Sequence, residues 1–344
     1  MPKKKTRADD LEQSKEPTQE AASLKNEAAN TELASSRIAD EKQIKKALEG
    51  KARVHFEGLG AAWTAVTGMA GRVVIPQVVG TVLQEGGTRP AWQWKKQGKD
   101  YVLLAWPKEE PLRASLLMSG AEEGKLVPIS CVPLLEGLPN DLTVETVHPW
   151  EQGGGANIGV QMLNEGEPMW FYDPCYIRDC DDLTEGVTHT FLLSALAFGV
   201  RKALLDEITV TQGPAYEAYA QAWLADHTDA SRLDVPPLKI NVAGKKIIHP
   251  GHAFAEYQIR TVIDDVDDCV LDKMPIKILY TSFPFEDRDP LRLPIYVAKV
   301  NLGTYEPKAG DEIDAYVWFQ GRVVDWDGKA IDTDDERQNK EEKA

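Results

Sequence analysis

Residues 290–325 read PLRLPIYVAKVNLGTYEPKAGDEIDAYVWFQGRVVD, and this stretch has the clearest structural pattern in the chain. Apolar residues alternate with other residues near both of its ends, and a period of two places one set of side chains on a buried sheet face. Between them, the run Tyr305–Asp311 contains proline, glycine and aspartate, which favour a turn. The pattern predicts two paired strands with the inward sets Leu291, Leu293, Ile295 and Val297, and Ile313, Ala315, Val317 and Phe319.

The opposite face of these two strands is aromatic and lies beside arginines. Such faces stack unpaired bases on open β-barrels, and aromatic residues and arginine are also enriched where two protein surfaces meet. The alternative is that both faces of the sheet are buried, one of them against a helix that carries Tyr216 and Trp223. The predicted binding residues are Tyr296, Tyr305, Tyr316, Trp318, Arg292 and Arg322.

The chain is acidic. Among its 344 residues, 39 are Lys or Arg and 55 are Asp or Glu, which gives a formal net charge of −16. The first fifty residues carry ten charges of each sign, so the whole net negative charge lies on residues 51–344. Nucleic-acid binding requires clustered cations that replace the counterions of phosphates, and the acidic body disfavours it. The charge favours a protein partner or a basic surface.

Cysteine usage and hydropathy indicate the compartment. The four cysteines, Cys131, Cys175, Cys180 and Cys269, form no CxxC pair and no dense disulfide framework. The apolar stretch Phe191–Val200 is too short to span a bilayer, and no signal peptide is visible. We therefore expect a cytoplasmic protein that does not enter a membrane.

Composition divides the chain into four regions. Residues 1–50 are rich in charged and small polar residues and contain no aromatic residue, so they cannot bury enough surface to offset the entropy of ordering. Three consecutive glycines, Gly153–Gly155, mark a predicted domain boundary. The predicted regions are a disordered charged tail (1–50), a small β-rich domain (51–150), an α+β domain with a C-terminal barrel-like sheet (156–325) and an acidic flexible tail (326–344).

Shorter patterns predict the remaining elements. Apolar runs bounded by glycine or proline predict strands, and apolar residues three to four apart predict helices. A helix begins at Gly213-Pro214, where proline suits the first turn, and we expect its stripe of Tyr216, Tyr219, Ala220, Trp223 and Leu224 to face a core. Predicted strands include 71–75, 78–83, 92–94, 101–106, 158–163, 169–172, 207–211, 238–242, 259–263 and 276–283, and a second helix is predicted over 192–205.

The stretch FYDPCYIRDCDDL, residues 171–183, combines carboxylates and thiols, and His189 follows shortly after. These groups are metal ligands, so a metal-dependent hydrolase in the Asp173 to His189 region is an alternative function. However, the five-residue spacing of Cys175 and Cys180 matches no metal-site pattern, and an Asp-Pro turn with an acidic surface loop explains the same residues. A second acidic run, Asp264–Asp268, is expected at a charged hairpin tip. We predict no metal and no other cofactor.

The segment Pro307–Ala315, PKAGDEIDA, resembles the Gly-Asp turn that leads into a strand of small barrels such as the oligonucleotide/oligosaccharide-binding (OB) fold. The resemblance implies an architecture and no activity. The predicted fold class is α+β and mostly β, with a C-terminal small barrel-like (OB-like) antiparallel sheet. One or two helices pack on this sheet, and a smaller β-rich domain precedes it.

The chain contains no glycine-rich phosphate loop and no GxSxG nucleophile motif. We therefore expect a binding or scaffold protein, rather than an enzyme, that contacts another protein through its aromatic β face. The alternatives are the metal-dependent hydrolase and single-stranded nucleic-acid binding by an OB-like barrel.

Overall fold

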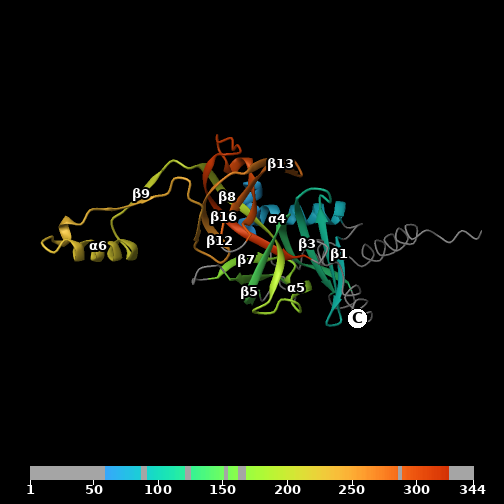
Figure 1. Ribbon diagram of the computed structural model, residues 1–344. Coiled ribbons are helices and arrows are strands. Elements are labelled where there is room, and N and C mark those ends of the chain that lie inside the picture. The colour runs from blue at the N-terminus through green and yellow to red at the C-terminus, as the bar shows by residue number, and fades with distance from the viewer. Residues whose placement is uncertain are drawn as a thin grey trace, which may run out of the picture.

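The computed structural model describes residues 59–86, 91–120, 125–150, 154–161, 168–285 and 289–324. In these ranges the protein is mostly β. It has a four-stranded antiparallel sheet, a ten-stranded mixed sheet and an arm that projects away from both (Figure 1). The predicted tails, 1–50 and 326–344, lie outside the described residues. Within the described ranges, no single helix has the length and hydropathy needed to cross a bilayer.

The N-terminal layer consists of helices packed on the four-stranded sheet. Its elements are α3 (Gly60–Thr67), α4 (Gly71–Thr81), the π-helical turn η1 (Val82–Gly86), β1 (Trp92–Lys96), β2 (Lys99–Trp106), β3 (Leu112–Gly120) and β4 (Leu126–Leu135). The strands lie in chain order, each antiparallel to the next. Trp63 of α3 is fully buried, and its indole N–H donates to the carbonyl of Cys131 on β4 at 2.8 Å. The predicted strands 92–94 and 101–106 are confirmed as β1 and β2.

The predicted strands 71–75 and 78–83 are wrong, because these residues form α4 and η1. Their β-branched side chains favoured a strand. However, Val74, Val78 and Val82 recur every four residues, and they pack together in the core between the helices and the sheet. Tertiary packing has overridden local propensity here.

The second sheet is mixed rather than antiparallel. Its strands are β5 (Leu138–Pro149), β6 (Ala156–Val160), β7 (Met169–Asp173), β8 (Thr188–Lys202), β11 (Ile247–Pro250), β12 (Glu256–Val262), β13 (Asp265–Leu271), β14 (Met274–Phe283), β15 (Leu291–Ala298) and β16 (Glu312–Val323). Their order is β11-β12-β16-β7-β6-β5-β8-β15-β14-β13. β15 runs parallel to β8, and β16 runs parallel to β7. β16 also pairs with β8, which folds the sheet back on itself, although it does not close as a whole because β11 and β13 stand at its two ends.

All eight side chains predicted to point inward from β15 and β16 belong to the core that this sheet encloses. The strand alternation is therefore confirmed. The predicted pairing of the two strands is wrong, because β15 pairs with β14 and β8, and β16 pairs with β12, β7 and β8. β8 lies between them.

Residues 192–205, predicted as a helix, instead continue β8 as far as Lys202. Both faces of this strand are buried: Phe191 and Leu193 belong to the core inside the mixed sheet, whereas Leu196 contacts the N-terminal layer. A strand that is buried on both faces shows no alternation, and its apolar run cannot be told from a helix by periodicity.

The glycine run expected at a domain boundary joins two neighbouring strands. β5 and β6 are antiparallel, with Pro149 opposite Ala156, and the sheet continues on both sides of this connection. The N–H of Trp150 donates to the carbonyl of Gly155 at 3.0 Å. A Cβ on Gly155 would clash with the hydroxyl of Tyr172. This glycine therefore permits a close approach of β7, and β5, β6 and β7 share one sheet.

Residues 203–246 form the arm, which consists of β9 (Glu207–Val210), α6 (Pro214–Asp226), η3 (Arg232–Asp234) and β10 (Leu238–Asn241). β9 and β10 pair as a two-stranded ribbon, and Figure 1 shows α6 at its far end, away from both sheets. The predicted helix is confirmed, but of its residues only Ala220 is buried. The expectation that its aromatic stripe covers a sheet is wrong.

The acidic run Asp264–Asp268 is not a hairpin tip. Most of it lies in β13, at the end of the mixed sheet, where Lys277 of β14 forms an ion pair with Asp268 at 2.8 Å. Charged residues on an edge strand discourage pairing with other chains. The predicted strands 158–163, 169–172, 207–211, 238–242, 259–263 and 276–283 correspond to β6, β7, β9, β10, β12 and β14.

Candidate functional site

The six predicted binding residues do not form one exposed surface. Tyr296 on β15 and Trp318 on β16 both lie opposite Leu196 of β8, so they face the same side with one strand between them. Tyr296, Trp318 and Arg322 are only 2%, 8% and 4% exposed. The N-terminal layer covers this part of the face. The alternative that both faces of the sheet are buried therefore holds here, with α3 and β4, rather than α6, as the cover.

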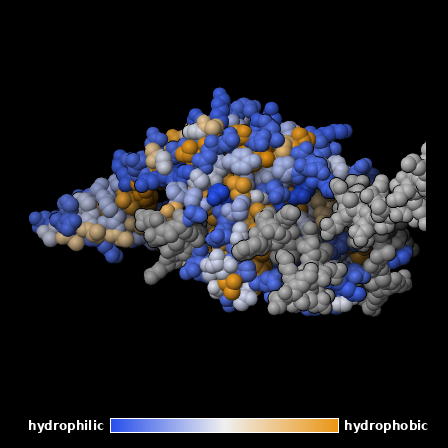
Figure 2. Space-filling view, turned by 45° about the vertical axis from the view of Figure 1, so that its right-hand side comes forward, coloured by the Kyte–Doolittle hydropathy of each residue, from blue (hydrophilic) through white to orange (hydrophobic). Residues whose placement is uncertain are grey.

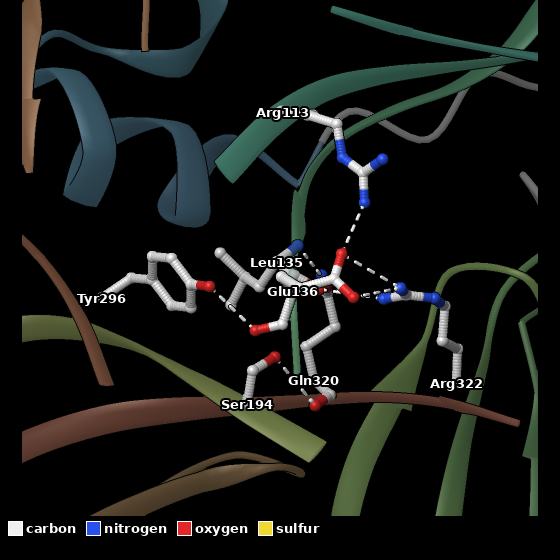
Figure 3. A network of polar contacts seen from close by, with 7 residues as sticks. All are labelled: Arg113, Leu135, Glu136, Ser194, Tyr296, Gln320 and Arg322. Carbon is white, nitrogen blue, oxygen red and sulfur yellow. Dashed lines mark hydrogen bonds and ion pairs between the residues drawn. The ribbon is translucent and has the colours of Figure 1, made fainter. Parts of the chain in front are cut away.

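A polar network joins the C-terminal half of β16 to the end of β4 (Figure 3). The side-chain amide of Gln320 donates to the carbonyl of Pro133 and accepts from the N–H of Leu135, both at 2.8 Å. Arg322 donates to the carbonyl of Leu135 at 3.0 Å and forms an ion pair with Glu136 at 3.2 Å. These contacts satisfy backbone groups on the side of β4 that faces away from β3, which an edge strand would leave unpaired.

Two further side chains complete the network around Glu136. Arg113 of β3 forms an ion pair with its carboxylate at 2.8 Å, and the hydroxyl of Tyr296 donates to its carbonyl at 2.8 Å. Burial raises the pKa of Tyr296, so the phenol keeps the proton that it donates. This part of the aromatic and arginine-rich face therefore joins two parts of the same chain and is not exposed to a partner.

Tyr305 and Arg292 lie away from this network. The Tyr305 hydroxyl donates to Asp311 at 3.0 Å within the turn before β16. Burial and that carboxylate raise the pKa of Tyr305. Arg292 is exposed and borders a cavity of about 360 Å³ next to Asn140. Neither residue contributes to a shared site with Trp318.

Tyr316 is the predicted residue that reaches an open site. It lines a groove of about 720 Å³ between the outer face of the mixed sheet and the beginning of the arm. We call this the arm-base groove. Its other lining residues are Gly199, Val200, Arg201, Leu205, Ile208, Ile247, His249, Gln258, Ile259, Arg260, Asn301, Asp314 and Ala315.

An ion pair forms part of the lining of the groove and fixes the arm. Arg260 of β12 donates to both carboxylate oxygens of Asp314 at 2.7 and 3.1 Å, and to the carbonyl of Leu205 at 2.6 Å. The hydrogen bonds to Asp314 raise the pKa of Arg260. Because Leu205 lies near the start of the arm, this hydrogen bond ties the first residues of the arm to β12.

Apolar side chains dominate the rest of the groove and continue beyond it. Leu205 and Ile208 of the arm are 60% and 42% exposed. Figure 2 shows hydrophobic side chains gathered where the arm joins the body. Opposite them, Ile247 of β11 lines the groove from the sheet. Tyr316 donates its hydroxyl to Glu256 and lies 5.6 Å from the ring of Phe198.

In the region from Asp173 to His189, residues 173–179 form a turn that packs against β1, whereas most of residues 181–188 are exposed. Asp173 accepts from the N–H of Cys175 at 2.7 Å and starts the short helix α5 (Tyr176–Asp179). Arg178 is bidentate to Asp179 at 2.6 and 2.7 Å and lies 5.1 Å from the ring of Trp92. The expected Asp-Pro turn is present, but Asp173 and Asp179 are fully buried rather than on a surface loop.

The geometry of this turn offers no metal site among the described residues, where no group of three His, Cys, Asp or Glu could hold an ion. Burial and the nearby Asp179 raise the pKa of Asp173 to about 8. Burial also raises the pKa of Cys175 to about 12, so its thiol stays protonated and is a poor nucleophile. The carboxylate of Asp179 is already bound to a guanidinium. The turn therefore joins β7 to the N-terminal layer through charges that neutralise each other.

Of the residues that line the arm-base groove, the sequence predicted only Tyr316 as a binding residue. Ile208 occurred in a predicted strand, and Arg260 in another, but nothing in their spacing placed them together. They meet because β12 pairs with β16 while β9 leaves the sheet after β8. The signal that was present is an apolar pair, Leu204-Leu205, in a polar stretch where no core requires it.

Comparison of the chain with protein-family models, with curated proteins and with solved structures gave no match.

Proposed function

We propose that this protein is a non-catalytic binding protein that holds an apolar segment of a protein partner in the arm-base groove. The observation that carries the proposal is the groove of about 720 Å³, which has apolar walls on both the arm and the sheet. Ligand sites typically have volumes of about 300–1,000 Å³ and mostly apolar linings with a few placed polar groups.

The arm favours a polypeptide over a small ligand. Leu204 is 79% exposed and Ile240 is 40% exposed, so apolar surface continues from the groove along the ribbon. Exposed apolar surface of this kind on a projecting element marks interaction sites. A segment of a partner can cover the groove and the ribbon together, because it is longer than a compact ligand.

Charge argues against single-stranded nucleic acid as the occupant. Of the two arginines that line the groove, Arg260 is bidentate to Asp314, and Arg201 lies 3.7 Å from the same carboxylate. A phosphate backbone would meet this carboxylate and the net charge of −16. The alternative hydrolase at Asp173 to His189 lacks support, since Asp173 and Asp179 are buried and no group of three His, Cys, Asp or Glu among the described residues could hold a metal ion.

We also propose that five strands of the mixed sheet form an OB-like unit. Support comes from the pairing, in which β5, β6, β7, β16 and β8 follow one another and β8 pairs again with β5. OB folds are five-stranded, partly open barrels. One residue pair, Gln320 with Tyr172, joins β16 to β7. The arm and strands β11 to β15 then form a single insertion between β8 and β16.

The four cysteines are all free, which is compatible with a cytoplasmic location, and we include this location in the proposal.

The experiment is a comparative capture from the native host, with wild-type protein and the variant Ile208→Asp as baits. A charge in the apolar wall of the groove should abolish capture of a specific partner, since burying an unpaired carboxylate is costly. The captured protein is then purified and titrated against both baits by calorimetry. We expect its affinity for Ile208→Asp to fall by at least about tenfold.

Thr184→Asp is the matched control, because Thr184 is exposed on the turn before β8 and lies far along the chain from the arm. It adds the same charge and should leave the titration unchanged. Equal affinity of the purified partner for wild type and Ile208→Asp would refute the groove as its site. Thermal unfolding of each bait checks that the substitution has not altered the fold.

A further inference from the structure

An exposed aromatic cluster lies on another part of the mixed sheet, where β5, β7 and the segment before β12 meet. It consists of His148, Trp170 and Phe254, whose ring centroids are 4.7, 4.9 and 5.7 Å apart. Phe254 is 54% exposed. Trp170 lies across Gly159 of β6, where a Cβ would come within 3.2 Å of the indole. The ring is therefore supported from below by backbone and offers a broad apolar surface.

Trp150 extends this surface at the end of β5. Its side chain is 39% exposed, and its ring lies 5.6 Å from that of Tyr172, which in turn lies 5.3 Å from that of Trp318. Trp318, which the sequence suggested as an exposed binding residue, is the buried inner end of this aromatic row. The row reaches solvent at Trp150.

The stretch of sequence that supplies most of the cluster is acidic. Residues 138–200 contain ten Asp and Glu and a single cation, Arg178. That cation is 2% exposed and bidentate to Asp179, so it contributes nothing to the surface. Among the described residues of this stretch, the exposed carboxylates are Asp141, Glu145, Asp181, Asp182 and Glu185, of which Asp181 forms an ion pair with Lys96 at 2.9 Å.

We propose that the aromatic cluster and Trp150 bind an arginine-bearing segment of a basic partner protein. A guanidinium is attracted to the face of an aromatic ring, most strongly to that of tryptophan. The chain itself shows this geometry twice, with Arg178 5.1 Å from the Trp92 ring and Arg232 5.2 Å from the Tyr216 ring. The net charge of −16 attracts such a partner from a distance and speeds its association.

Charge also selects against other occupants of the cluster. A second copy of this chain carries the same negative charge, and a nucleic acid would bring phosphates to a chain with a net charge of −16. The cluster lies outside the arm-base groove, and its residues are not among those that line the groove. The inference is thus independent of the proposed function, and each can fail without the other.

The test uses a nine-residue peptide with three arginines separated by glycine, and a second peptide with citrulline at each arginine position. Citrulline keeps the shape and removes the charge. Calorimetric titration into the full chain at low salt should give an affinity at least about tenfold higher for the arginine peptide. Its affinity should fall when the salt concentration is raised. Equal affinities, or no binding of either peptide, would overturn the proposal.

Two variants separate ring stacking from general attraction to an acidic protein. Phe254→Ala and Trp150→Ala remove exposed rings without changing any charge. Each substitution should lower the affinity of the chain for the arginine peptide about five- to tenfold. Trp223→Ala, which removes a ring from the arm, is the control and should leave the affinity unchanged, as should Ile208→Asp in the groove. Unchanged affinity in both cluster variants would mean that the peptide binds by net charge alone and would refute the site.

The chain's own basic run, Lys3 to Arg7, is the competing occupant. Deletion of residues 2–7 should leave the affinity for the arginine peptide unchanged. If the deletion raises the affinity for the arginine peptide about tenfold, this run occupies the cluster in the full chain. That result would overturn the proposal that the cluster binds a partner protein.

Discussion

The two halves of β16 follow the same alternation but have different neighbours. In the C-terminal half, the outer side chains Trp318, Gln320 and Arg322 are buried under the N-terminal layer and contact the end of β4. In the N-terminal half, Asp314 and Tyr316 have the same orientation and line an open groove. One strand therefore supplies both an internal interface and a candidate binding site.

The difference shows what an aromatic strand face can and cannot indicate. Its composition favoured contact with the surface of a partner, whereas in the C-terminal half the covering surface is the chain's own N-terminal layer. Whether that surface belongs to the same chain depends on where a distant sheet lies. β4, more than 180 residues earlier in the chain than Gln320, covers one half, and no described element covers the other. The experiments below test this contrast between a covered and an open half.

The largest effect is expected from truncating the aromatic residue of the covered half. Trp318→Ala should lower the free energy of unfolding by about 3–5 kcal/mol, because it leaves a cavity between two layers. Tyr316→Ala, two residues earlier, should cost about 1 kcal/mol, because its ring is only half-buried and water can replace its hydrogen bond to Glu256. Urea denaturation of both variants measures the difference. Similar losses would mean that the groove is part of the core.

The polar network is expected to contribute the next largest effect. Gln320→Leu keeps a similar side-chain volume but leaves the carbonyl of Pro133 and the N–H of Leu135 buried without partners. The free energy of unfolding should therefore fall by about 2–4 kcal/mol. The same substitution at the exposed Gln258 in the groove should change stability by less than about 0.5 kcal/mol. A loss below about 1 kcal/mol at Gln320 would show that water enters the interface easily.

Asp173, at the end of β7, is fully buried and should make stability depend on pH. Its pKa in the native state is about 8 instead of the ordinary 3.8, so between these values the folded chain keeps a proton that the unfolded chain has lost. Stability should therefore fall as pH rises from about 4 to 8 and level off above it, with a slope on the order of 1 kcal/mol per pH unit.

Asp173→Asn removes this titration and should abolish that slope, whereas Asp229→Asn on the arm should keep it. Denaturation midpoints at several pH values between 5 and 9 provide the measurement. A slope that survives in Asp173→Asn would assign the titration to another group. The shift of the Asp173 pKa arises mainly from burial, so the pH at which the slope levels off reports how far burial has raised that pKa.

The smallest effect on the body is expected from changes to the arm. The arm contributes few buried residues, and its backbone is the most accessible part of the open side. Among the described residues, limited proteolysis should cleave first within residues 203–246. Leu233→Ser changes a side chain that is 96% exposed. It should leave the free energy of unfolding of the sheets within about 0.5 kcal/mol of wild type. First cleavage within β4 or β16 instead would contradict the contrast drawn here.

Local patterns predicted most strands, because their alternation reflects one buried and one less buried face. They failed for α4 and for β8 for opposite reasons. In α4, valines suited to a strand pack on one side of a helix. In β8, apolar residues on both faces hid the alternation, because a core lies on each side of the strand. The α6 helix was predicted correctly from its proline and its stripe, but nothing local placed it at the end of an arm.

The candidate site was predictable only in part. Tyr316 was identified from the aromatic pattern of its strand, whereas Arg260, Leu205 and Ile208 join it through pairings between distant segments. The aromatic cluster of His148, Trp170 and Phe254 likewise draws on three segments that no short window contains together. Its acidic surroundings, in contrast, could be read from residues 138–200 alone.

The sequence by itself determined the two faces of β16, since a period of two in a strand leaves no freedom in which side chains point together. It also determined the acidic charge of the body and the helical state of α6. Only the tertiary structure decided what covers each face, because that depends on contacts between segments far apart in the chain. The same alternation thus produces a buried polar interface at Gln320 and an open groove at Tyr316.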